Sequence, residues 1–157
     1  MSNEEWEDSA IKTVKKLKND GDLIASLFLC SAFVEHYCRT KLFLYLTDIR
    51  PLELIEVTDK VTKRKKKAFI LCELEKIIFR DFRSHHTIIK VGLLVGAWNK
   101  ELYDQLICFN EKRNHLIHRY ENILKILEKD EGRKEAEDTI ELGLSLLQNI
   151  KVGKIKS

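Results

Sequence analysis

Apolar residues recur along most of the chain at intervals of three and four, which is the spacing of one face of an α-helix. This pattern predicts helices over Glu4–Lys18, Leu23–Leu46, Ala68–Phe82, Asn99–Tyr120 and Lys134–Ile150. The second of them, which Asp22 is expected to cap, is apolar on nearly all sides, as is typical of the central helix of a bundle. The expected fold is therefore all-α: an antiparallel bundle of four to five helices in a single domain, residues 1–157.

Two stretches between these helices carry a mixed pattern. Thr87–Trp98 is short, apolar and β-branched, which alone would suit a buried strand, but its helical surroundings favour a short helix or a connector. Its Gly92 and Gly96, four residues apart, would permit close approach of a second helix. The segment Glu121–Lys129 either continues or kinks the preceding helix, and Glu131–Gly132 is expected to make a turn.

Residues 48–67 are the least regular part and form a predicted basic insertion. Arg50–Pro51 breaks the preceding helix, because proline lacks a backbone N–H and restricts the residue before it; a short helix over Leu52–Val61 is expected to follow. The run KVTKRKKK, Lys60 to Lys67, holds six basic residues and no acidic one. Such a run is either a solvated loop or an arm that contacts the RNA backbone without reading sequence. The candidate RNA-contacting residues are Lys63, Arg64, Lys65, Lys66 and Lys67. Residues 151–157 are expected to form a flexible tail.

Composition agrees with a helical protein and argues against other classes. One Pro and six Gly argue against a turn-rich β fold, and the net charge of +3 requires local clustering for any affinity for nucleic acid. The acidic N-terminus and the lack of a long uncharged apolar stretch predict a soluble cytoplasmic protein, with no membrane span. The four cysteines form no CxxC pair, so we expect free buried thiols at Cys30, Cys38, Cys72 and Cys108.

No metal site and no cofactor are expected. The polar segment Asp81–His86 is predicted to be a linker, and its two adjacent histidines, His85 and His86, would point to different faces of a helix or strand. Two such side chains cannot bind one metal ion unless further ligands come from elsewhere.

A charged residue interrupts the apolar stripe of the Asn99–Tyr120 helix. Asn99 is expected to cap this helix, and Arg113 occupies one step of the stripe that faces the core. Either Arg113 lies at the edge of the stripe and reaches water along its alkyl stem, or it is placed to meet a ligand, since a guanidinium is costly to desolvate. The other steps of the stripe are Leu102, Leu106, Phe109, Leu116 and Tyr120.

Polar residues on the neighbouring face indicate which ligand that would be. Asn110, Asn114 and His118 recur at four-residue intervals beside Arg113. A guanidinium stabilises charge on phosphate oxygens, and an imidazole moves protons to or from a ribose hydroxyl or a leaving oxygen. The candidate catalytic residues are therefore Arg113 and His118, with Asn114 holding the imidazole or a phosphate oxygen.

The Leu23–Leu46 helix carries a carboxylate in a comparable position. Glu35 occupies one step of a stripe in which the other residues are Ile24, Phe28, Ser31, Cys38 and Leu42. It is expected to pair with Arg113 and orient it, or to form an i, i+4 pair with Arg39. Both pairs can exist at once.

The segment RNHLIHRY, Arg113 to Tyr120, resembles a known family. Arg113 and His118 match the Arg-x4-His signature of the HEPN superfamily. Tyr120 extends the match to Arg-x4-His-x-Tyr, the form found in HepT-type toxins of HEPN–nucleotidyltransferase toxin–antitoxin pairs. The matched motif covers this segment alone, and the basic insertion around Lys60 to Lys67 departs from the HepT pattern.

The resemblance implies a four-helix-bundle core, a homodimer with both motifs in one cleft, and metal-independent RNA cleavage by the 2′-hydroxyl, as in a toxin or defence ribonuclease. A dimer also answers a chemical need, because one imidazole cannot easily act as both base and acid, and a two-fold partner would supply a second His118. A nucleotidyltransferase antitoxin is the further implied partner, with Tyr120 as the residue that it modifies.

A non-catalytic function is the alternative. The chain would then be a helical module that binds a nucleotide or a partner nucleotidyltransferase, with Arg113 and His118 serving as an anion site. A purely structural role is the third interpretation. In that case Arg113 is a paired core cation, His118 is stabilised by the helix dipole, and Tyr120 packs against the core.

Overall fold

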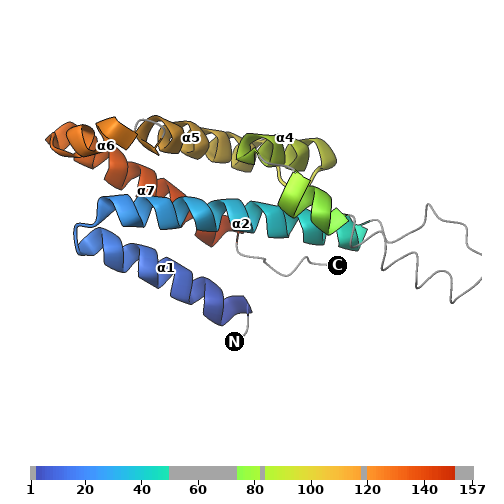
Figure 1. The fold of residues 1–157 in the computed structure, drawn as a ribbon. Helices are drawn as coiled ribbons and strands as arrows, with labels where there is room; N and C mark the ends of the chain where they lie inside the picture. Colours follow the sequence, from blue (N-terminus) through green and yellow to red (C-terminus); the bar gives the residue numbers. More distant parts are fainter. Residues whose placement is uncertain (1–2, 50–73, 82–83, 118–119, 151–157) are drawn as a thin grey trace, which may run out of the picture.

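The computed structural model describes residues 3–49, 74–81, 84–117 and 120–150, and this part of the chain is an all-α helical bundle without strands (Figure 1). The prediction of an all-α fold is confirmed. The elements within these ranges are α1 (Asn3–Asn19), α2 (Leu23–Ile49), the π-helical turn η1 (Ile77–Asp81), α4 (His85–Val95), α5 (Lys100–Ile117), α6 (Tyr120–Leu127) and α7 (Asp130–Ile150).

Helix α2 lies at the centre of the bundle and contacts α1, α4, α5 and α7. Figure 1 shows α1 and α5 running in one direction and α2 and α7 in the other, so α2 is antiparallel to α1 and α5 and parallel to α7. Its apolar residues explain this position, because Leu27, Val34 and Leu42 are all fully buried. One residue of the predicted stripe departs from it, since Phe28 is 40% exposed.

Side-chain caps fix the starts of α2 and α5 as predicted. Asp22 Oδ1 accepts the backbone N–H of Ala25 at 3.0 Å, and Asn99 Oδ1 accepts that of Leu102 at 2.9 Å. Each bond satisfies one of the N–H groups that a helix leaves unpaired in its first turn. The caps place α5 so that its stripe faces α2 and α7, where Leu106, Phe109 and Leu116 are buried.

The segment Thr87–Trp98 contains a short helix, as favoured, but its glycines follow the prediction only in part. Gly96 has φ +83° and ends α4 in the left-handed conformation, in which glycine carries no Cβ penalty. A Cβ on Gly92 would lie 1.8 Å from Trp98 Cζ2, so this glycine makes room for the indole, whose Nε1 donates to Ile89 O at 3.0 Å. At Gly96 the expected approach of a second helix is seen, since a Cβ there would lie 3.0 Å from Tyr45 Oη of α2, whereas the neighbour of Gly92 is Trp98.

Two predicted boundaries were wrong. His85 and His86 do not lie in a linker, because α4 begins at His85. Glu131 and Gly132 lie in the first turn of α7, where acidic side chains favour a helix N-terminus, and a Cβ on Gly132 would lie 2.0 Å from Ile126 O. Of the helix predicted over Ala68–Phe82, the described residues 74–81 are helical and end in the π-helical turn η1.

The cysteines follow the prediction in part. Cys30 and Cys38 are buried free thiols, and burial raises the pKa of each to about 12. Cys108 is a free thiol but is exposed, contrary to the prediction, because it lies on the outer face of α5. Within the described ranges, no helix is long and apolar enough to cross a membrane.

Several predictions fall outside the described residues. These are the break at Arg50–Pro51, the short helix over Leu52–Val61, the thiol Cys72, the tail 151–157, the catalytic candidate His118 and the candidate RNA-contacting residues Lys63, Arg64, Lys65, Lys66 and Lys67.

Candidate functional site

Arg113 projects from α5 toward α2, and only 16% of its side chain is exposed. Its Nη1 donates to Asn114 Oδ1 at 2.8 Å, and its Nη2 lies 3.9 Å from Glu35 Oε2 on α2. Its Nε is buried and has no hydrogen-bond partner among the described residues. Burial lowers the pKa of Arg113, and the nearby Glu35 carboxylate opposes that effect. The guanidinium is therefore held inside the protein with part of its hydrogen-bonding capacity unused.

Glu35 contacts both partners that the sequence proposed for it, and Arg39 is the closer. Glu35 Oε1 accepts from Arg39 Nη2 at 2.7 Å and from Arg39 Nε at 3.2 Å. Arg39 is itself buried, and its Nη1 donates to the backbone carbonyl of Ile78 in η1. The Glu35 carboxylate thus lies between the two guanidiniums, and the π-helical turn holds one of them, Arg39, through a backbone carbonyl.

His85 lies in the same place and was missed by the sequence reasoning. Only 5% of its side chain is exposed, its Nδ1 is 3.9 Å from Glu35 Oε2, and neither ring nitrogen has a hydrogen-bond partner among the described residues. Burial lowers its pKa to about 4; Glu35 opposes this, and Arg113, Arg39 and His86 add to it. His85 is therefore neutral at physiological pH.

A signal for His85 was present in the sequence. The buried residues of α4 are His85, Ile88, Ile89 and Gly92, which are spaced by three, one and three and so share one face. Extending the apolar period of Thr87–Trp98 back by one turn would have placed His85 on this face. His86, the next residue, is only partly buried.

We refer to Glu35, Arg39, His85, Arg113 and Asn114 as the Glu35 cluster. Its two guanidiniums and one carboxylate, with His85 neutral, leave one net positive charge in a largely buried place. A buried charge is stable when it is paired, and a buried donor when it is hydrogen-bonded. The excess charge and the unused Nε of Arg113 are therefore suited to an anion.

The structure brings some of the predicted site residues together. Arg113, Asn114 and Glu35 are in contact, and Asn114 Oδ1 accepts a hydrogen bond from Arg113. His118 lies outside the described residues, and Tyr120 is placed only as the first residue of α6. Among the described residues, no group of three or more His, Cys, Asp or Glu side chains is arranged to hold a metal ion.

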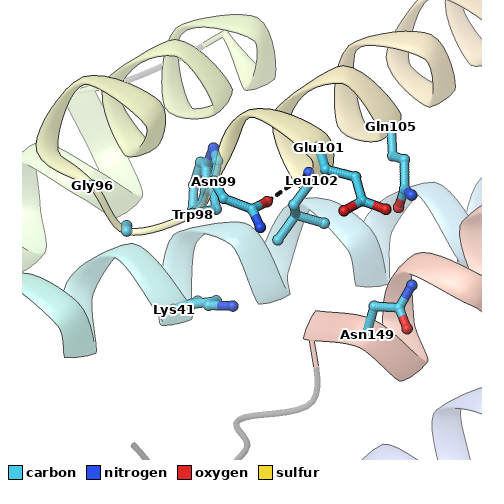
Figure 2. Close-up of a pocket in the computed structure, with 9 residues that line it drawn as sticks. Lys41, Gly96, Trp98, Asn99, Glu101, Leu102, Gln105 and Asn149 are labelled. Atoms are coloured by element: carbon cyan, nitrogen blue, oxygen red, sulfur yellow. Dashed lines mark hydrogen bonds between the residues drawn. The ribbon is translucent and has the colours of Figure 1, made fainter.

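A separate cavity of about 550 Å³ lies between α2, the start of α5 and the end of α7. Figure 2 shows Lys41 of α2 on one side of it, Glu101 and Gln105 of α5 on another, and Asn149 of α7 beside them. Burial lowers the pKa of Lys41. No member of the Glu35 cluster lines this cavity, so the cavity and the cluster are distinct features of the bundle.

We compared the chain with protein-family models, with curated proteins and with solved structures, and none of them matches it. The HEPN resemblance therefore rests on the residues Arg113 to Tyr120 and on the helical pattern alone. Any functional assignment has to be argued from the chemistry of the Glu35 cluster.

Proposed function

We propose that the protein is an endoribonuclease that cleaves RNA without a metal ion, by attack of the ribose 2′-hydroxyl on the adjacent phosphate, and that it acts as a toxin or defence ribonuclease. The observation that supports the proposal is the position of Arg113. Among the described residues, its largely buried guanidinium shares one carboxylate, Glu35, with the more deeply buried Arg39, and its Nε has no hydrogen-bond partner. A phosphate would supply the missing negative charge and acceptor oxygens.

Each residue then has a definite role in the reaction. Arg113 stabilises the charge that develops on the phosphate oxygens as the 2′-oxygen attacks. His118, five residues further along the chain, transfers the proton. Asn114 holds Arg113 through the 2.8 Å hydrogen bond, Glu35 Oε2 lies 3.9 Å from its Nη2, and Arg39 holds the Glu35 carboxylate in place. The products are a 2′,3′-cyclic phosphate and a 5′-hydroxyl.

The proposal includes a homodimer and a regulating partner. Two subunits related by a two-fold axis would place two copies of His118 in one cleft, where one acts as base and the other as acid. A nucleotidyltransferase antitoxin that modifies Tyr120 would add bulk and negative charge close to Arg113 in sequence and so block the substrate phosphate. The run from Lys63 to Lys67 would add affinity for the RNA backbone that falls with salt.

RNA cleavage in the presence of EDTA tests the proposal. We expect the wild-type protein to cleave single-stranded RNA, and Arg113→Ala and His118→Ala to lower the rate by about 10²-fold or more. Each variant has a matched control on α5: Lys112→Ala removes an exposed cation next to Arg113, and His115→Ala removes an exposed imidazole near His118. Both controls should cleave at the wild-type rate.

Several results would contradict the enzyme. Cleavage that stops in EDTA and returns with a divalent cation would rule out the metal-independent mechanism. Activity that falls equally in Arg113→Ala and Lys112→Ala would reflect general loss of positive charge and not a site. Wild-type cleavage by a well-folded His118→Ala variant would remove the proposed proton donor.

A non-catalytic module is the second candidate, and one observation favours it. Among the described residues, Arg113 contacts Asn114 and Glu35, and Arg39 holds Glu35, so a guanidinium suited to an anion is positioned without a contribution from an exposed histidine. Such a module would bind RNA or a nucleotide without turnover. Binding of intact RNA that weakens in Arg113→Ala, together with no cleavage by the wild-type protein, would support the module over the enzyme.

A further inference from the structure

The two oxygens of the Glu35 carboxylate have different surroundings. Oε1 is fixed by two hydrogen bonds from Arg39, at 2.7 and 3.2 Å. Oε2 lies 3.9 Å from Arg113 Nη2 and also 3.9 Å from His85 Nδ1. Both distances exceed that of a hydrogen bond, so Oε2 is equally far from Arg113 Nη2 and His85 Nδ1 and is hydrogen-bonded to neither.

His85 is a member of the Glu35 cluster whose side chain makes no hydrogen bond to the described residues. Its ring is buried with both nitrogens lacking a hydrogen-bond partner among the described residues, which is rare for a polar side chain inside a protein. The charged or titratable groups around it are Glu35 and Arg39 from α2, Arg113 from α5 and His86 from α4. Arg113 and Arg39 oppose protonation of His85, while Glu35 favours it.

An anion at Arg113 would reverse this balance. The anion would neutralise Arg113, one of the two guanidiniums that oppose protonation of His85, and its own negative charge would favour that protonation. It would also compete with Glu35 for Arg113, which frees Oε2 for another donor. His85 Nδ1 is already at the same distance from this oxygen as Arg113 is.

We propose that an anion bound by Arg113 draws this guanidinium away from Glu35, and that His85 then takes up one proton from solvent and, as an imidazolium, donates a hydrogen bond from Nδ1 to Glu35 Oε2. This inference rests on the proposed function, because it uses Arg113 as the phosphate-binding group. Each added charge has a partner of opposite sign: the bound anion pairs with Arg113, and the imidazolium that His85 becomes on protonation pairs with Glu35. Arrival of a substrate phosphate thus creates a charged imidazole beside Glu35.

The inference predicts that anion affinity depends on pH. The pKa of His85 is about 4 in the free protein and would be higher in the complex. Between these two values the complex binds more protons than the free protein, so the dissociation constant should rise with pH, by up to about tenfold for each unit. Above the pKa that His85 has in the complex, its titration should no longer change the dissociation constant with pH.

Isothermal titration with inorganic sulfate tests this, because sulfate does not titrate near neutral pH. Measured at one pH in two buffers of different ionisation enthalpy, wild-type protein should take up as much as about one proton per sulfate bound. His85→Gln should bind sulfate without proton uptake. His86→Gln, which alters the neighbouring and less buried imidazole of α4, is the matched control and should behave like wild type.

The outcomes separate this inference from the proposed function. Sulfate binding without proton uptake in the wild type, or with unchanged uptake in His85→Gln, would overturn the inference and leave the ribonuclease standing. No sulfate binding, or binding that survives in Arg113→Gln, would remove the anion site and overturn both. NMR titration of His85 in the wild-type protein needs no variant: its pKa should rise by at least about one unit with sulfate, and an unchanged pKa would refute the inference.

Discussion

Replacement of Glu35 by Gln tests the network most directly, since glutamine keeps the shape and one acceptor oxygen but removes the charge between two guanidiniums. At the 3.9 Å that separates Glu35 from Arg113, opposite charges attract by about 4 kcal/mol when the effective dielectric constant is about 20. The contact with Arg39 is shorter, at 2.7 Å. The desolvation of the carboxylate offsets part of this attraction, and its 32% exposure screens a further part.

We therefore expect Glu35→Gln to lower the free energy of unfolding by about 2–3 kcal/mol, below the range of about 3–5 for a fully buried broken pair. For a chain of this length the melting temperature should fall by roughly 4–12 °C. Thermal and urea unfolding followed by circular dichroism at neutral pH would measure both. Glu111→Gln, which alters an exposed carboxylate on α5, is the matched control and should stay within about 0.5 kcal/mol of wild type.

A second measurement distinguishes a site residue from a merely structural one. Because Arg113 loses a neutralising charge, Glu35→Gln should bind sulfate more tightly than the wild type although it is less stable. A melting temperature equal to that of Glu111→Gln, or weaker sulfate binding, would refute the reasoning from charge.

Two further predictions concern stability. His85 has a pKa near 6.5 in the unfolded chain and near 4 in the folded protein, so the unfolded state binds more protons between these values. The free energy of unfolding should therefore fall by about 3 kcal/mol as the pH drops from 6.5 to 4. Urea titrations at several pH values should show this pH dependence in wild type and in His86→Gln, and a weaker one in His85→Gln. A Cβ on Gly143 would lie 2.4 Å from Cys30 Sγ and 2.7 Å from Phe109 Cε2, so Gly143→Ala should cost about 1–3 kcal/mol in overpacking against about 1 gained in helix propensity. Ser145→Ala, on the exposed face of the same helix, should not destabilise, and a Gly143→Ala protein more stable than wild type in urea would contradict the packing argument.

The features that were predicted correctly depend on residues close together in the sequence. The long helices follow from apolar spacing, and the caps at Asp22 and Asn99 follow from one side chain and the next three residues. Arg113 was identified for the same reason, because a charged residue that interrupts an apolar stripe can be recognised from the sequence of one helix.

The missed features depend on packing between distant segments. The distance from His85 to Glu35 arises only when α4 lies against α2, so the apolar period of α4 could have placed His85 on a buried face but could not have shown which residue it meets. The space around Gly92 is likewise set by Trp98, which folds back on α4 beyond a turn that Gly96 makes. Local pattern predicted which segments are helical and, through charges placed in apolar stripes, the pairing of Glu35 with Arg113 and Arg39, but not the approach of His85.

The π-helical turn at Ile77–Asp81 has a consequence for variation in chain length. A turn of this kind accommodates one residue more than an α-helical turn does, and here Ile78 directs its carbonyl at Arg39. Deleting one residue would restore the ordinary period and rotate the preceding carbonyls by about 100° about the axis. Arg39 would lose its backbone acceptor although every member of the Glu35 cluster remained. A single-codon deletion there is thus expected to do more harm than most substitutions of exposed side chains.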